Sequence, residues 1–195
     1  MDITYSINFH NDWHCGSGLS AGADLDLLVI KDKNGLPFVP GKTVKGLLRE
    51  AMIDILTFSG EEEKDKTLVN LLGKENEKKD NQQEKEFTGN QGCLFFTNAN
   101  LEDKVAAELT ACNAQKYLYR GISSTAIGED GVAKKHSLRR MEVTVPCKLT
   151  GCIKNVPENH LDLIENSLKY IKRMGQNRNR GLGRCDIILE KGGQS

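Results

Sequence analysis

The sequence has no long hydrophobic run and no excess of charge of either sign. No stretch of its 195 residues approaches the roughly 20 apolar residues that a membrane-spanning helix needs. The first twelve residues, MDITYSINFHND, contain no apolar segment typical of a secretory signal, so a cytoplasmic protein is expected. Lys and Arg number 27 and Asp and Glu also number 27, so the overall charge does not point to a nucleic acid or a membrane.

The six cysteines lack the C-x-x-C spacing of zinc sites. Cys147 and Cys152 are five residues apart, which puts them on opposite faces of a strand. His10 and His14 can share a strand face, but no nearby residue completes a metal site. Reduced thiols and no structural zinc are therefore expected.

A nucleotide-binding P-loop is also missing, although PGKTVKG at 40–46 places Gly-Lys-Thr at the start of a helix. The P-loop motif needs a glycine five positions before Gly41, and position 36 is leucine. Pro37 and Pro40 remove backbone amides that would bind phosphate. An ATPase is therefore not expected.

The apolar periodicities predict an α+β fold. Strands are expected at 3–9, 25–31, 94–99, 140–153 (bent at Pro146) and 185–189, and helices from Gly41 and over 157–174, the second ending at Gly175. This order favours a single ferredoxin-like or RRM-like sheet with two helices on one face, in one domain covering 1–195.

Two segments add to this domain. Residues 59–91 hold nine acidic and six basic residues around a small apolar group, which is typical of a mobile charged surface insertion. Residues 117–135 are rich in Gly, Ser and Thr and predict an extended β-hairpin at about 120–140. Because the insertion holds many of the acids, the rest of the chain is mildly basic, which permits an anionic partner.

Three basic clusters are candidates for binding nucleic-acid phosphates: Lys42, Lys45 and Arg49; Lys134, Lys135, His136, Arg139 and Arg140; and Arg178, Arg180 and Arg184 around Gly181 and Gly183. Each can equally be a solvated basic surface. Three such clusters in a neutral protein favour an RNA or DNA partner. Only 6% of residues are aromatic, so base stacking is expected to contribute little.

GLSAGADLDLLVIKDKNGLPFVPGKTVKGLLREA at 18–51 resembles the N-terminal signature of the RAMP (repeat-associated mysterious protein) superfamily. The likeness is greatest to the repeating backbone subunit of type III CRISPR effector complexes. LVNLLGKEN with GCLFFTNANL, GISSTAIGEDGVAKKHSLRRMEVTVP and RNRGLGRCDI are similar to later family segments, the third of them to the thumb-like β-hairpin. Asn98 stands where the family often has aspartate, and the chain is short for the family.

The resemblance implies a function and a set of site residues. In cleaving members an aspartate before the "VI" stretch supports metal-dependent cleavage of target RNA, which implies Asp26, with Asp24 as the alternative, and Mg²⁺ or Mn²⁺ at Asp26. Both aspartates can instead simply cap or hydrate the loop. The implied RNA-binding residues are Ser20, Gly22, Lys42, Thr43, Lys45, Arg49, Thr125, Lys134, Arg139, Arg140, Arg178, Arg180, Gly181, Gly183 and Arg184.

The expected protein is thus an endoribonuclease subunit that binds CRISPR guide RNA, target RNA, copies of itself and other effector subunits. Two alternatives stay open: a catalytically silent backbone or accessory subunit, and a repeat-RNA processing endoribonuclease using His14 or His136 as general base. Every hypothesis in which the protein binds RNA requires the N-terminal glycine loop and the C-terminal glycine-arginine loop to lie close together.

Overall fold

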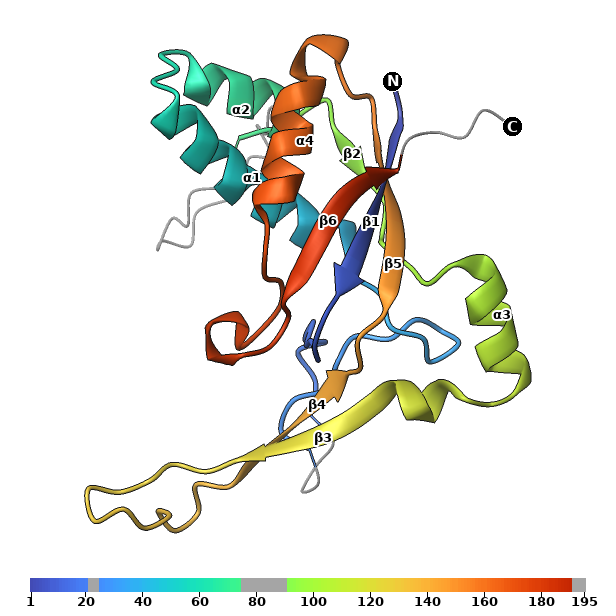
Figure 1. Cartoon of the computed structure of the whole chain (residues 1–195), viewed down its shortest axis with the longest axis vertical. Helices are drawn as coiled ribbons and strands as arrows, with labels where there is room; N and C mark the ends of the chain where they lie inside the picture. The colour runs from blue at the N-terminus through green and yellow to red at the C-terminus, as the bar shows by residue number, and fades with distance from the viewer. Residues whose placement is uncertain (21–24, 75–90, 191–195) are drawn as a thin grey trace, which may run out of the picture.

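The chain forms a four-stranded sheet, two helices on one face of that sheet and a two-stranded hairpin that projects from it (Figure 1). The computed structural model describes residues 1–20, 25–74 and 91–190. The strands are β1 (Ile3–Phe9), β2 (Phe95–Phe96), β3 (Tyr119–Ser124), β4 (Arg139–Thr144), β5 (Lys148–Lys154) and β6 (Cys185–Glu190). The helices are α1 (Gly41–Phe58), α2 (Lys64–Leu72), α3 (Asp103–Ala111) and α4 (Leu161–Tyr170).

The strand order of the main sheet is β2-β5-β1-β6, and every neighbouring pair is antiparallel. In β1–α1–β2 the two strands flank β5, and in β5–α4–β6 they flank β1, so the two units interleave. The predicted mixed architecture of helices and antiparallel sheets is confirmed.

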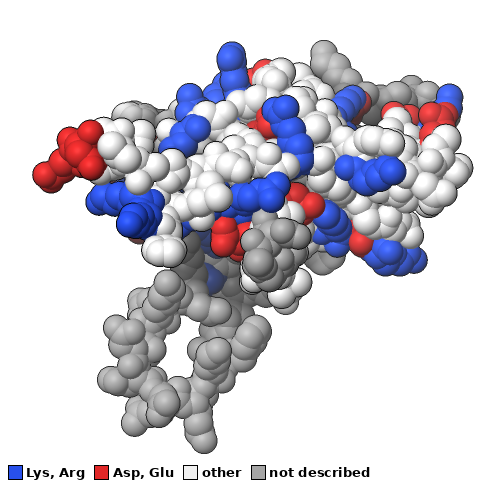
Figure 2. Space-filling view, turned by 90° about the horizontal axis from the view of Figure 1, so that it is seen from below, with Lys and Arg blue, Asp and Glu red and all other residues white. Residues whose placement is uncertain are grey.

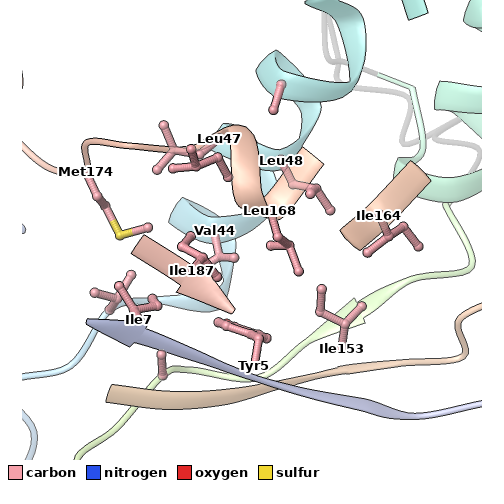
Figure 3. Packing of buried hydrophobic residues seen from close by; sticks show 14 of the residues in the cluster. Tyr5, Ile7, Val44, Leu47, Leu48, Ile153, Ile164, Leu168, Met174 and Ile187 are labelled. Carbon is pink, nitrogen blue, oxygen red and sulfur yellow. The ribbon is translucent and has the colours of Figure 1, made fainter. Parts of the chain in front are cut away.

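Alternation along β1 builds the core. Tyr5 and Ile7 point toward the helices and are fully buried, while the intervening positions face the other side of the sheet. Leu48 of α1 and Leu168 of α4 pack onto these side chains (Figure 3). Burying this continuous apolar layer is the main favourable term that holds helices and sheet together.

Three predicted elements differ in the structure. Residues 25–31 form isolated bridges with Gly16, Met141 and Pro37 instead of a regular strand. Strand β2 has two residues instead of the six expected at 94–99. Helix α4 ends at Tyr170, so the prediction that Gly175 caps it was wrong. The chain after α4 turns extended because Ile171 and Met174 then reach the core, where both are buried.

The charged region 59–91 was predicted to be an insertion, yet its described part contains a packed helix. The apolar residues Leu68, Leu71 and Leu72 of α2 are buried against the core, whereas residues 75–90 lie outside the described residues. Helix α3 was not predicted, because it buries none of its residues and so carries no strong periodic signal. None of the helices in the described ranges is long and apolar enough to cross a membrane.

The hairpin predicted at about 120–140 consists of β3 and β4 in a sheet of their own. Their register pairs Tyr119 with Thr144 and Ser124 with Arg139. Strand β4 ends two residues before Pro146, and β5 begins two residues after it in the other sheet. The predicted bend at Pro146 is therefore where the chain passes from one sheet to the other.

Candidate nucleic-acid interface

The N-terminal loop after β1 and the C-terminal loop before β6 lie against each other. The Gly183 amide donates to the Asp12 carbonyl at 2.7 Å, and the Gln176 amide donates to the His14 carbonyl at 2.8 Å. The Arg184 amide donates to Asn11 Oδ1 at 2.8 Å. Segments more than 160 residues apart in the sequence thus form one structure, and the expected convergence of the two loops is confirmed.

Glycine is required at two of these contacts. A Cβ on Gly183, whose φ is +68°, would lie 1.9 Å from the Met174 carbonyl oxygen. A Cβ on Gly175, whose φ is +94°, would lie 2.4 Å from the His14 carbonyl oxygen. A larger residue at Gly175 would push the two loops apart, and one at Gly183 would push it away from Met174 within the C-terminal loop, since real Cβ atoms do not approach backbone this closely.

The first turn of α1 completes a pocket of about 340 Å³ between the two loops. Its lining residues are His14, Cys15, Gly16, Ser17, Ile30, Pro40, Lys42, Thr43, Leu47, Gly175, Gln176 and Arg178. Lys42 and Arg178 supply positive charge, with the Arg178 guanidinium 3.4 Å from Glu50 Oε2, and the N-terminus of an 18-residue helix adds the positive end of its dipole. Such a pocket favours an anion such as a phosphate group.

Lys45 and Arg49 lie on the same helix but have different surroundings. The Arg49 guanidinium donates to the carbonyls of Leu72 and Gly73 at 3.0 and 2.8 Å, so it holds the end of α2. Partial burial, and then the charge of Arg49, lower the pKa of Lys45. Arg49, which is also among the residues predicted to bind RNA, thus holds the end of α2, and neither Lys45 nor Arg49 lines the pocket.

Asp26 lies on the outer part of the same N-terminal loop and is exposed. Its amide donates to the Arg140 carbonyl at 2.8 Å, and its Oδ2 accepts from the Arg140 amide at 2.7 Å. The same loop joins Asp26 to Ser17, which lies in the wall of the pocket. The Ser17 amide donates to the carbonyl of Leu28, two residues after Asp26. Ser20 is exposed on this loop, whereas Asp24 and Gly22 lie outside the described residues.

The hairpin residues predicted to bind RNA are exposed but distributed along its length. Thr125 Oγ1 lies 2.6 Å from Ser137 Oγ and joins the two sides of the hairpin. Lys134 lies farther out, and Arg139 and Arg140 lie in β4. Of these four hairpin residues Arg140 is the one hydrogen-bonded to Asp26, and the outer hairpin projects away from the main sheet (Figure 1).

Comparison with known proteins identifies the family. The sequence matches the model of the RAMP superfamily over residues 6–186. The chain belongs to the RAMP superfamily. No curated protein matches this sequence.

The fold of this RAMP protein is similar to that of two chains in solved structures. One belongs to the cryo-EM structure of the Type III-B Cmr-beta bound to cognate target RNA, with a TM-score of 0.66, 11% identity and 97% coverage of both chains. The other belongs to the apo state of the Type III-B Cmr-beta, with a TM-score of 0.66, 12% identity and 98% coverage of both chains.

A second basic area adjoins the C-terminal loop of the RAMP domain. Lys172, Arg173 and Arg184 line a second pocket together with Cys185 and Asp186, whose carboxylate pairs with Lys172 at 3.0 Å. Arg180 and Gly181 are exposed on the same loop. Viewed from the end that carries the hairpin and the loops, Lys and Arg side chains spread across the face (Figure 2). The surface can therefore hold an extended polyanion and not only a single phosphate.

Asp26 can take a divalent cation only together with oxygens from outside the described chain. Among the described residues, no group of three or more His, Cys, Asp and Glu side chains lies close enough to bind a metal. An exposed carboxylate fits Mg²⁺ or Mn²⁺, because these ions keep several waters and accept phosphate oxygens as ligands. The single Asp26 carboxylate is compatible with such an ion but does not form a complete site among the described residues.

Two residues of this surface have roles that the sequence did not indicate. His14 is fully buried, and its Nδ1 donates to the Glu142 carbonyl at 2.6 Å. Nε2 has no hydrogen-bond partner in the described structure. Glu142 is also buried, although alternation in β4 predicts an outward side chain. Only long-range contacts reveal both roles.

Proposed function

We propose that this protein is a guide-RNA-binding backbone subunit of a type III CRISPR effector complex, and that it cleaves the complementary target RNA with a divalent cation. Membership of the RAMP superfamily supports this proposal. The fold similarity to chains of the Type III-B Cmr-beta, one of them bound to cognate target RNA, also supports it. The interleaved sheet and its two helices correspond, on this proposal, to a ferredoxin-like RNA-binding domain.

The observation that carries the proposal is the pocket between the two loops and the first turn of α1. It gathers Lys42, Thr43 and Arg178 from segments far apart in the sequence, and its main charges are positive. Phosphate contacts of this kind fix the position of a strand without reading its sequence. Guide RNA is bound here through its backbone, and target choice then comes from base pairing.

The hairpin and Asp26 act on the paired target strand. The hairpin projects from the main sheet (Figure 1). On this proposal it separates a short stretch of the guide–target duplex. Asp26 sits where this hairpin meets the N-terminal loop. The cleaved linkage is therefore the one that the hairpin presents beside Asp26.

The reaction is an in-line attack within the target RNA. The 2′-oxygen bonds to the adjacent phosphorus, the 5′-oxygen leaves with the electrons of the broken P–O bond, and a proton passes from the 2′-hydroxyl to solvent while the 5′-oxygen gains one. Asp26 would hold the divalent cation, which would stabilise the negative charge that develops on the phosphate oxygens. The chain itself contributes the carboxylate and the geometry that splays the strand.

A catalytically silent backbone subunit is the second candidate. The hydrogen bond that Asp26 accepts from the Arg140 amide is what a purely structural loop aspartate would make. The processing endoribonuclease receives no comparable support. His14 is buried and its Nδ1 is already engaged, and His136 is exposed on the hairpin and does not line the pocket.

Asp26→Asn separates the two candidates, since an asparagine oxygen can still accept from the Arg140 amide while the charge is lost. We expect target cleavage by the reconstituted complex to fall roughly 100-fold or more, because several kcal/mol of charge stabilisation are removed. Asp54→Asn, an exposed aspartate of α1, is the matched control. Cleavage that persists in Asp26→Asn would assign the silent role.

The bound RNA tests the binding half of the proposal. RNA co-purified with the protein and its partner subunits is sequenced, and repeat-derived guides of uniform length are expected. Unprocessed repeat precursors would point to the processing endoribonuclease, and a random RNA population would refute guide binding.

A further inference from the structure

Glu142 is a buried acid in the strand that joins the hairpin to the rest of the molecule. It lies in β4 and is 8% exposed. A buried carboxylate is costly unless it is paired and hydrogen-bonded. The contacts of Glu142 therefore indicate why an acid stands at this position.

The carboxylate of Glu142 binds the N-terminal loop at two points. Oε1 accepts from Lys31 Nζ at 2.7 Å, and Oε2 accepts from the Val29 amide at 3.2 Å. Lys31 Nζ also lies 4.0 Å from the centre of the Tyr119 ring in β3. The ion pair thus connects the loop to both strands of the hairpin.

The backbone of Glu142 binds the same region. Its amide donates to the Leu27 carbonyl at 2.9 Å, and its carbonyl accepts from His14 Nδ1. Leu27, Val29 and Lys31 are alternate residues directly after Asp26. Glu142 therefore holds the part of the loop that directly follows Asp26. Through His14 it also contacts the wall of the pocket.

Asp26 itself is held by the residue two positions before Glu142. Its paired bonds with Arg140 require the loop and β4 to keep their present register. If the loop no longer bound Glu142, the two hydrogen bonds between Asp26 and Arg140 would be an isolated contact at the exposed end of the loop. The direction of the Asp26 carboxylate therefore depends on Glu142 without any contact between the two side chains among those described.

We propose that Glu142 is a positioning residue for the Asp26 loop and that it fixes Asp26 relative to the hairpin and the pocket. The part of this inference that concerns cleavage rests on the proposed function. The part that concerns the order of the loop rests only on the contacts of Glu142. The two parts are measured separately.

The experiment uses the reconstituted complex with four variants. Glu142→Gln keeps an oxygen that can accept from the Val29 amide and loses the ion pair, and Lys31→Met removes the same ion pair from the other side. Lys31→Arg keeps a cation for Glu142 and serves as the conservative rescue. Glu129→Gln, at an exposed hairpin position, is the matched control.

Three quantities are measured: guide-RNA affinity, the single-turnover cleavage rate with the positions of the cuts, and hydrogen exchange at 25–31. For Glu142→Gln and Lys31→Met we expect guide affinity within about twofold of the wild type and cleavage about 10- to 100-fold slower, as small displacements of a reacting group cause. The cuts spread to neighbouring linkages, and exchange at 25–31 becomes faster. Lys31→Arg and Glu129→Gln behave as the wild type.

Each other outcome overturns the inference or a defined part of the argument. Unchanged cleavage and cut positions in Glu142→Gln refute positioning, whether or not exchange changes. Loss of folding and guide binding together with cleavage assigns Glu142 a general structural role and also refutes positioning. If the wild type binds guide but does not cleave, the proposed reaction fails. The hydrogen-exchange measurement then decides by itself whether Glu142 orders the loop, and faster exchange at 25–31 in Glu142→Gln would show that it does.

Discussion

Gly183→Ala is expected to separate the two loops that form the pocket. The new methyl group would lie 1.9 Å from the Met174 carbonyl oxygen, where no flexible side chain can give way. The substitution also places a Cβ on a backbone with φ of +68°. Gly183 donates to Asp12 and accepts from the Met174 amide, so a shift that relieves the overlap breaks the contact between the loops.

Gly181→Ala isolates the size of this effect. Gly181 also has a positive φ, +91°, but a Cβ there meets nothing within 4 Å. Its substitution therefore costs only the backbone term, about 1–2 kcal/mol. Gly183→Ala adds a steric term and is expected to cost a total of about 3–5 kcal/mol, the range of exceptional single substitutions.

The assay combines thermal unfolding with RNA binding. For a chain of this length each kcal/mol corresponds to about 2–4 °C in Tm, so Gly183→Ala is expected to lower Tm by about 6–20 °C and Gly181→Ala by about 2–8 °C. Guide-RNA affinity falls in Gly183→Ala at temperatures where the protein is still folded. Equal Tm values for the two variants would refute the close packing of Gly183 against Met174 in the C-terminal loop.

Three further predictions concern single charged residues. Lys42→Gln is expected to weaken guide-RNA binding and to reduce the slope of log K against log salt by about 0.7, the value for one lost phosphate contact on a single strand, and an unchanged slope would remove Lys42 from the RNA path. Arg49→Met is expected to lower the free energy of unfolding by about 1–3 kcal/mol through loss of its bonds to the end of α2, with the salt slope unchanged in RNA titrations. The hydrogen bond from His10, and then that from Lys172, lower the pKa of Asp186, so its stabilising effect is present above the unfolded value of about 3.9 and is lost as pH falls through the lower folded value. Asp186→Asn is therefore expected to destabilise the protein at neutral pH, with a difference from wild type that shrinks in urea unfolding below about pH 4, and a constant difference across pH would contradict this.

Local patterns in the sequence were sufficient for the elements that build the core. Alternation in β1 and helical spacing in α1 predict the observed elements, because each pattern must face one buried layer. The family signature likewise depends on contiguous residues and identified the superfamily. Helix α3, whose residues are at most partly buried, lacks such a local signal, and the strand predicted at 94–99 is shorter in the structure, where β2 has two residues.

The sequence alone therefore determined the fold class, the family and the segments that carry basic residues and Asp26. The tertiary structure decided which of these residues share a surface: Lys42 and Arg178 meet at one pocket, whereas Arg49 turns to the end of α2. It also decided that Glu142 and His14 are buried and joined to the N-terminal loop. The reason is physical, since periodicity records only which face of an element is buried, while the partner of a buried polar group is set by chain segments that are distant in sequence.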